Sequence, residues 1–253
     1  MIFIYIVGTA GSGKSTLTNA FNEWCHHKGY DSIAVNLDPG AIKLPYEAEI
    51  DVREWISLEE IMKEYNLGPN GAQIVGADML ALNVKEIEER IGEYRADYIV
   101  FDTPGQLELF VFRSAGKVII EQLGRKNSIL AFLIDPSLAT TPASFTSQLM
   151  LSAITQFRLD IPLINILSKT DIVEEKALNM ILEWGENVDK LRNDLMAQSS
   201  LYSMLSEGII NIIEEMKAHT SLIPLSSETW EGMEDFYAEI QNIFYGGEDL
   251  ERK

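Results

Sequence analysis

The chain has 253 residues, is 46% hydrophobic and carries a formal net charge of −19. This is enough for one α/β domain over residues 1–253, or for a domain with an insertion. The acidic charge disfavours direct nucleic-acid binding, no apolar stretch approaches the roughly 18 residues of a membrane span, and the single cysteine, Cys25, excludes an intrachain disulfide and fits a reducing, cytoplasmic setting.

Short apolar runs alternate with helical patterns along the chain. The runs predict buried strands at residues 2–7, 32–37, 97–102, 129–135, 163–168 and 221–225. Continuous apolar strands separated by helices are typical of a parallel sheet covered on both faces. We therefore expect a doubly wound, mostly parallel, Rossmann-like α/β fold of three layers.

Helix signals divide the rest of the chain. A capping box begins at Ser57, Thr141 stands as N-cap before a proline, and Gly29 ends the first helix. We expect a helical segment over 58–95, a last helix over about 231–244, and a frayed tail over 247–253. Residues 172–219 are interpreted as a helical insertion before the last strand, which either covers the core or contacts another subunit.

The most informative run lies at residues 8–16, Gly-Thr-Ala-Gly-Ser-Gly-Lys-Ser-Thr, which fits the phosphate-loop (Walker A) pattern G-x-x-x-x-G-K-[ST]. A strand that feeds a glycine loop into a helix N-terminus makes an anion site. We expect nucleotide phosphates to contact Gly11, Ser12, Gly13, Lys14, Ser15 and Thr16. Lys14 is placed between the β- and γ-phosphates and Ser15 on Mg²⁺, so the fold is interpreted as a P-loop NTPase.

A second motif closes the run at 97–102 and reads Asp102-Thr103-Pro104-Gly105-Gln106. An acid at such a strand end can hold a water of the Mg²⁺ shell, Gly105 can donate its N–H to the γ-phosphate, and Gln106 can orient an attacking water. The alternative is a simple Pro-Gly turn.

A third motif, Ser168-Lys169-Thr170-Asp171, is similar to the guanine-reading [NT]-K-x-D motif of GTPases. One carboxylate, Asp171, can accept both N1–H and the 2-amino group of guanine, whereas adenine would leave it unpaired. The stem of Lys169 is placed over the base, and Ser226 and Ser227 form a candidate base-side loop. Alternatively, Asp171 is a helix N-cap.

Two further features have competing interpretations. Asp38 ends the run at 32–37, where its carboxylate can meet the metal's water shell or the attacking water, although Asp38-Pro39-Gly40 also suits a turn. His26 and His27 point about 100° apart on a helix, so the helix dipole explains them better than a metal does.

Together these motifs resemble the GPN-loop GTPases over nearly the whole chain. Beyond the general GTPase motifs, the resemblance rests on Asn36-Leu37-Asp38-Pro39, Leu44-Pro45-Tyr46, Asp51-Val52-Arg53 and Gly68-Pro69-Asn70. The chain departs from the family at Gly40, often Ala there, and at Ile42-Lys43. The resemblance is to a single-domain, archaeal-type member, with the fold of the dimeric signal-recognition and cell-division P-loop proteins.

The resemblance implies an Mg²⁺-dependent homodimer that hydrolyses GTP to GDP and phosphate. It implies that Asn70 acts across the dimer interface, that Gln106 and Glu108 hold or polarise the water, and that Asp38 and Asp102 belong to the metal and water shell. Glu108 has an alternative role at a helix N-terminus. Arg53 is interpreted as a partner for Glu49 or Asp51 rather than an arginine finger. The lack of such a finger predicts slow turnover, or catalysis supplied by the dimer geometry and Asn70.

The family also suggests a biological role, because its eukaryotic members act in RNA polymerase assembly. A protein client and a nucleotide-driven assembly switch are therefore expected, without nucleic-acid or membrane binding. The alternatives are a nucleotide-gated scaffold with little turnover and a related ATP-dependent P-loop ATPase. The ATPase class carries a second lysine early in the phosphate loop, where this chain has Thr9.

Overall fold

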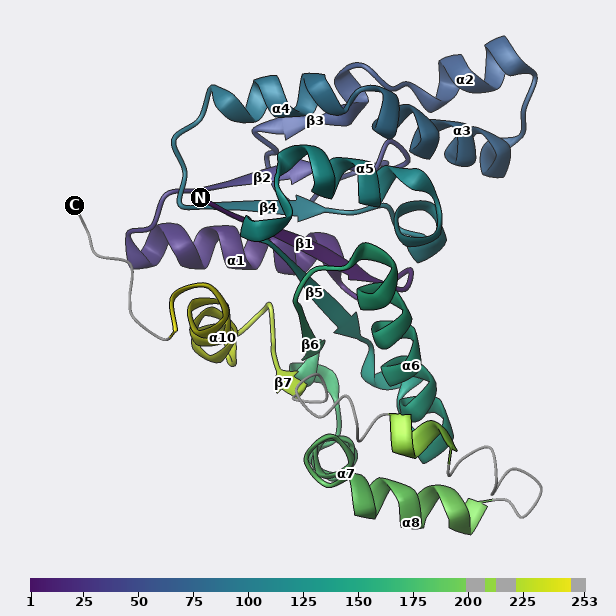
Figure 1. Ribbon diagram of the computed structural model, residues 1–253, viewed down its shortest axis with the longest axis vertical. Helices are drawn as coiled ribbons and strands as arrows, with labels where there is room; N and C mark the ends of the chain where they lie inside the picture. Colours follow the sequence, from purple (N-terminus) through teal and green to yellow (C-terminus); the bar gives the residue numbers. More distant parts are fainter. Residues whose placement is uncertain (199–207, 213–221, 247–253) are drawn as a thin grey trace. The chain divides into compact units, whose positions relative to one another are not determined.

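The computed structural model describes residues 1–198, 208–212 and 222–246 (Figure 1). Its strands form one sheet with the order β3-β2-β4-β1-β5-β6-β7. Their bounds are Ile2–Gly8 (β1), Ser32–Asn36 (β2), Ile50–Asp51 (β3), Tyr98–Asp102 (β4), Ser128–Ile134 (β5), Leu163–Leu167 (β6) and Leu222–Pro224 (β7). The doubly wound α/β fold predicted from the sequence is confirmed, with β3 as an additional strand.

The chain divides into two compact units. Unit 1 comprises residues 1–131 and 156–162, and unit 2 comprises residues 132–155 and 163–253. The helices of unit 1 are α1 (Lys14–Lys28), α2 (Leu58–Tyr65), α3 (Pro69–Leu82), α4 (Val84–Gly92) and α5 (Ser114–Leu123), with short turns at Val52–Glu54 (η1), Glu108–Phe112 (η2) and Arg125–Asn127 (η3). Each unit is described by itself below.

Within unit 1, β4 lies between β1 and β2, and all its strand pairs are parallel. Helix α1 lies on one side of these strands, and α3, α4 and α5 lie on the other (Figure 1). Every residue of β1, β2 and β4 is buried, which explains why these segments are continuously apolar rather than alternating. Tyr5 stacks on Phe101 at a centroid distance of 4.5 Å in the middle of this core.

The register aligns the carboxyl ends of three strands. Asp102 pairs with Ile6 of β1 and with Asn36 of β2. Loops that leave parallel strands at the same edge of a sheet lie close together, and this edge is where open α/β sheets bind ligands. The phosphate loop, the Asp38 turn and the Gly105 turn all leave from it.

The predicted helix signals of unit 1 are confirmed. Helix α1 ends at Gly29, which has a φ of 82° in the left-handed region, with basic residues in its last turn. Helix α2 begins at Ser57, whose hydroxyl accepts the Glu60 N–H at 3.3 Å. Such a cap satisfies a backbone donor that the helix itself leaves unpaired.

Unit 2 contains the parallel pair β6 and β7, with helices on its flanks. Its helices are most of α6 (Pro142–Leu159), α7 (Glu175–Glu186), α8 (Val188–Gln198) and α10 (Met233–Tyr245), with short turns at Pro136–Leu138 (η4) and Thr170–Ile172 (η5). Helices α7 and α8 fall within the predicted insertion. The remainder of that insertion over 199–207 and 213–219, and the predicted frayed tail, lie outside the described residues.

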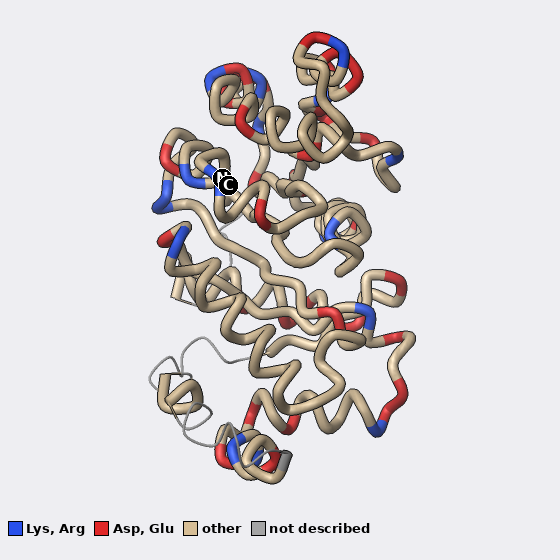
Figure 2. Tube along the Cα trace, turned by 90° about the vertical axis from the view of Figure 1, so that its right-hand side faces the viewer, with Lys and Arg blue, Asp and Glu red and all other residues tan. Residues whose placement is uncertain are grey.

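Charged residues lie mainly on helices and loops, where Lys and Arg alternate with more numerous Asp and Glu (Figure 2). This distribution follows from the cost of burying an unpaired charge in the strands. Within the ranges 1–198, 208–212 and 222–246, no helix is both long and apolar enough to cross a membrane.

Candidate functional site

In unit 1, the lysine of the phosphate loop hydrogen-bonds the backbone of the same loop. Gly8, Gly11 and Gly13 have φ values of 155°, 79° and 99°, in the region that favours glycine. The buried Lys14 Nζ donates to the carbonyl oxygens of Gly8 at 3.1 Å, Thr9 at 3.0 Å and Gly105 at 3.1 Å. The lysine therefore joins the phosphate loop to the turn after β4.

Burial lowers the pKa of Lys14, while the charges of Asp102 and Asp38 act in the opposite direction. These two carboxylates come from the other loops that leave the same sheet edge. The three charged groups thus form one electrostatic cluster.

Asp102 is the buried acid of this cluster. Its side chain hydrogen-bonds the Ser15 hydroxyl, and its Oδ2 accepts the Tyr46 hydroxyl at 3.0 Å. Burial raises its pKa to about 6, against the effects of Ser15, Tyr46 and Lys14. Tyr46 belongs to a motif that the sequence supported only through the family resemblance.

Ser15 and Asp102 suit a magnesium ion. Mg²⁺ prefers oxygen ligands, keeps several waters and takes only one or two ligands from the protein when it is bound with phosphates. A hydroxyl and a carboxylate in contact with each other provide that donor set. Among the described residues, no three or more His, Cys, Asp or Glu side chains are grouped so that they could hold a metal ion. His26 and His27 therefore belong to no such group.

Asp38 accepts a hydrogen bond from the Gly105 N–H, which is the donor that we expect to bind the γ-phosphate. Its Oδ2 accepts the Gly105 N–H at 2.9 Å, and its Oδ1 accepts the Gly40 N–H at 2.8 Å. Asn36 supports this turn by accepting the Asp38 N–H at 3.0 Å. Both oxygens therefore bind backbone donors, so a metal-shell or water-activating role of Asp38 requires it to leave Gly105.

Arg53 is committed to a partner, as the sequence suggested. It forms an ion pair with Asp51 at 2.5 Å, and its Nη1 donates to the Ala41 carbonyl at 2.7 Å. Asp51 also accepts the Asn36 side-chain amide at 2.9 Å. Arg53 thus braces the segment between Asp38 and β3, while Glu49 instead accepts the Ala34 N–H at 2.7 Å.

The two remaining catalytic candidates, Asn70 and Glu108, form no hydrogen bond or ion pair with this cluster within the described residues. Asn70 is the second residue of α3, exposed beside the N-cap Gly68, and Glu108 is the exposed first residue of the π-helix η2. No hydrogen bond or ion pair in the described part of the chain joins either of them to Lys14, Asp38 or Asp102.

Gln106 has a partner that sequence reasoning missed. Its Nε2 donates to Oε1 of Gln73 at 3.0 Å. Gln73 lies on α3, one helical turn after Pro69. The only signal in the sequence was the position of Gln73 one turn after Pro69. Nothing in the sequence connects it with Gln106, because the two residues are 33 positions apart.

The base-reading candidates belong to unit 2. Lys169 has a φ of 56°, and its Nζ bonds Asp135 Oδ2 at 2.7 Å. Asp171 is exposed within η5, and it caps neither η5, whose N-cap is Lys169, nor α7, whose N-cap is Glu174. The alternative interpretation of Asp171 as a helix N-cap is therefore wrong.

Two loops of unit 2 meet beside this motif. The Thr170 N–H donates to the Leu225 carbonyl at 3.4 Å, which brings the loop of Ser226 and Ser227 next to it. Ser226 is buried and its hydroxyl accepts the Thr229 N–H at 3.1 Å, whereas Ser227 is half-buried. Asp135, the anchor of Lys169, is the second residue that sequence reasoning missed.

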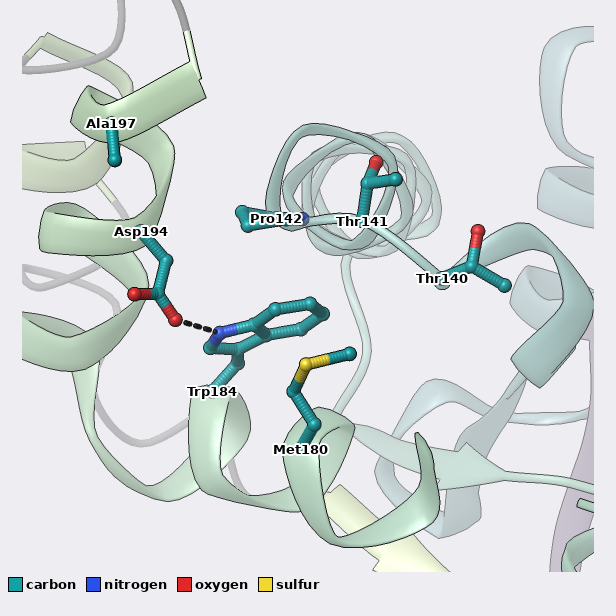
Figure 3. A pocket seen from close by; sticks show the side chains of 7 residues that line it. All are labelled: Thr140, Thr141, Pro142, Met180, Trp184, Asp194 and Ala197. Atoms are coloured by element: carbon teal, nitrogen blue, oxygen red, sulfur yellow. Dashed lines mark hydrogen bonds between the residues drawn. The ribbon is translucent and has the colours of Figure 1, made fainter. Parts of the chain in front are cut away.

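Unit 2 also has an open hollow of about 350 Å³ (Figure 3). Its lining consists of Thr140, Thr141, Pro142, Met180, Trp184, Asp194 and Ala197. Trp184 Nε1 donates to Asp194 Oδ2 at 2.9 Å beside it. None of the predicted site residues lines this hollow, so it is distinct from the motif-bearing loops.

Comparisons with known proteins identify relatives of this chain. The model of a family described as "Conserved hypothetical ATP binding protein" matches residues 6–246. The chain is 32% identical to GPN-loop GTPase 1 of Schizosaccharomyces pombe over 94% of its length and 67% of the relative's. For a Dictyostelium discoideum GPN-loop GTPase 1, the chain spans only 60% of the relative.

The archaeal relative matches from end to end. The chain is 33% identical to the GPN-loop GTPase PAB0955 of Pyrococcus abyssi, over 92% of this chain and 94% of that protein. The crystal structure of PAB0955, described as a GTPase in apo form, superposes with a TM-score of 0.88 over 96% of this chain and 98% of that one. By sequence and by fold, the chain belongs to the GPN-loop GTPase family.

Proposed function

We propose that this chain binds GTP and hydrolyses it to GDP and phosphate with Mg²⁺. The observation that carries the proposal is the position of Lys14, whose ammonium joins the phosphate loop to the carbonyl of Gly105 at the carboxyl edge of the sheet. A cation held there, at the N-terminus of α1, faces the region where a triphosphate is stabilised by backbone amides and the helix dipole.

Each residue of the cluster then has a task. Lys14 exchanges its carbonyl partners for β- and γ-phosphate oxygens. Ser15 and Asp102 would hold Mg²⁺, which would neutralise charge on the phosphates. Gly105 turns its N–H from Asp38 to the γ-phosphate, and Gln106 accepts a hydrogen bond from the attacking water.

Guanine is the base that this site is expected to select. Asp171 is exposed and ready to accept two adjacent donors, and Asp135 restrains Lys169 beside it. A hydrogen bond to a charged group is worth about 1.5–3 kcal/mol, or roughly 10- to 100-fold in affinity. GTP should therefore displace a labelled GTP analogue at concentrations that are lower than those of ATP by this factor.

The experiment is a competition between GTP and ATP, repeated with Asp171→Asn and Asp135→Asn. Asp171→Asn should abolish the preference, and Asp135→Asn should weaken it by releasing Lys169. The matched control is Glu183→Gln on the exposed face of α7, which should change neither value. If ATP competes as well as GTP in the unmodified protein, the base assignment is wrong and the ATP-dependent alternative gains support.

The resemblance also leads us to propose a homodimer in which Asn70 of one subunit serves the nucleotide of the other. Its support here is that Asn70 is exposed at the start of α3 and is not bonded to the Lys14 cluster of its own chain. Asn70→Ala and Lys14→Ala should each be inactive alone. Mixing them should restore hydrolysis, because the Lys14→Ala subunit supplies Asn70 to its partner's intact nucleotide site.

By family analogy we propose an assembly switch as the biological role, with a protein client such as RNA polymerase subunits. Immobilised protein loaded with a GTP analogue or with GDP should retain such subunits to different extents. Equal retention in both states would favour a plain hydrolase, and state-dependent retention without turnover would favour a scaffold.

A further inference from the structure

We propose that Gln73 is a positioning residue for hydrolysis, which fixes Gln106 through their amide hydrogen bond. This inference rests on the proposed GTPase function and deepens it. Its consequence is that α3, the helix that begins with Gly68-Pro69-Asn70, also acts within its own subunit. Helix α3 then contributes Asn70 to the nucleotide of the other subunit and Gln73 to Gln106 of its own subunit.

The first support is the difference in restraint between the two glutamines. Gln106 is exposed on the turn after β4, whereas Gln73 is half-buried on α3. An exposed side chain of this length samples many rotamers, and ordering it has an entropic cost. The 3.0 Å bond from Gln106 Nε2 to Gln73 Oε1 therefore transfers the order of the helix to the mobile partner.

The second support is that α3 is closely packed at this point. A Cβ built at Gly76, one turn after Gln73, would lie 2.8 Å from Leu58 Cδ2 and 3.1 Å from Pro39 Cγ. The helix backbone therefore lies directly against the turn that carries Asp38. Ala72 and Ala77 are completely buried on the same helix. Gln73 is thus carried by an element that cannot shift without disturbing the Asp38 turn.

The Gln73 side chain also lies close to that turn. A Cβ built at Gly40 would lie 3.4 Å from Gln73 Nε2 and 3.2 Å from Asp38 Oδ1. The Gln73 amide group therefore has its nitrogen near the Asp38 turn and its oxygen on Gln106. Glycine at position 40 keeps this space free of a Cβ. One side chain thus accepts a hydrogen bond from Gln106 and lies beside the Asp38 turn.

The chemistry explains why the amide must be fixed. In a glutamine amide the oxygen accepts hydrogen bonds and the nitrogen donates them. Only the oxygen can accept a hydrogen bond from an O–H group of the attacking water. Gln73 Oε1 is an acceptor, so it pairs with the nitrogen end of Gln106. This selects the orientation in which Gln106 Oε1 points away from α3. Without Gln73, the amide can rotate and present its nitrogen instead.

Gln73→Met tests the inference, because it keeps the length of the side chain and removes the amide. One neutral hydrogen bond corresponds to roughly a three- to tenfold change in rate, so kcat should fall by about that factor. The dissociation constant of a non-hydrolysable GTP analogue and the melting temperature should not change. The matched control is Gln122→Met, which removes an amide that donates to Glu88 at 2.6 Å elsewhere in unit 1, and it should leave kcat unchanged.

A double-mutant cycle separates positioning from a general structural effect. In a Gln106→Ala background, Gln73→Met should have no further effect on kcat, because the group it positions is gone. A fall in kcat of the same size in both backgrounds would overturn the inference, as would an unchanged kcat in the single variant. If the unmodified protein binds the analogue and does not hydrolyse GTP, the proposed function fails rather than the role of Gln73.

Discussion

Asp38→Asn should destabilise the protein more when no γ-phosphate is bound than when one is. Asp38 accepts one backbone N–H on each oxygen, from Gly40 at 2.8 Å and from Gly105 at 2.9 Å. Asparagine has only one accepting oxygen, so one of these donors would face an NH₂ group. A hydrogen bond to a charged group contributes about 1.5–3 kcal/mol, and we expect about 1–2 kcal/mol here because Asp38 is only half-buried.

For a protein of this size, that loss corresponds to a fall of roughly 2–8 °C in the melting temperature. Thermal unfolding should be measured without nucleotide, with GDP and with a non-hydrolysable GTP analogue, each with Mg²⁺. The γ-phosphate would take the Gly105 N–H, so the destabilisation should shrink with the analogue and persist with GDP. The same destabilisation in all three states would refute the idea that Asp38 stands where the γ-phosphate binds.

Three other properties can be checked on the protein without ligand. Burial raises the pKa of Asp102 from an ordinary 3.8 to about 6. Its contribution to the free energy of unfolding is therefore complete below about pH 4 and is lost as the pH rises through 6. Asp102→Asn should remove this pH dependence in denaturant titrations. Cys25 is buried with a pKa raised by burial to about 12, so iodoacetamide at pH 8 should label it only after unfolding. Gly232→Ala should destabilise by several kcal/mol, because its Cβ would lie 2.0 Å from the Pro224 carbonyl oxygen, whereas Gly246→Ala, with a left-handed φ of 66° and nothing within 4 Å, should cost only about 1 kcal/mol in thermal unfolding.

The sequence located the strand ends and their motifs because both signals are local. A continuous apolar run that ends at a glycine or an acid identifies a buried parallel strand and its loop, and this pattern was sufficient for β1, β4 and β5. It was not sufficient for β3, since the two residues Ile50–Asp51 are too few to show a period. That strand is recognised by its parallel pairing with β2, in which Val35 lies opposite Ile50 and Asn36 opposite Asp51.

The missed site residues share a different cause. Gln73 and Asp135 act through partners 33 and 34 positions away. Neither belongs to a motif, and a glutamine on a helix or an acid at a strand end has many ordinary roles. Their partners are seen only in the structure, where Gln73 bonds Gln106 and Asp135 bonds Lys169. Such contacts depend on the three-dimensional arrangement rather than on spacing along the chain.

In the cluster of unit 1, three groups that we expect to meet a nucleotide or its metal already have partners of the opposite polarity. Lys14 has backbone carbonyls, the Gly105 amide has Asp38, and Asp102 has the hydroxyls of Ser15 and Tyr46. Binding therefore exchanges partners, and its free energy is the difference between two satisfied states. A variant that weakens an internal partner should then strengthen binding, because the competing state becomes less stable. On this basis Asp38→Asn, although slower in hydrolysis, should bind the GTP analogue more tightly than the unmodified protein does, and GDP with unchanged affinity.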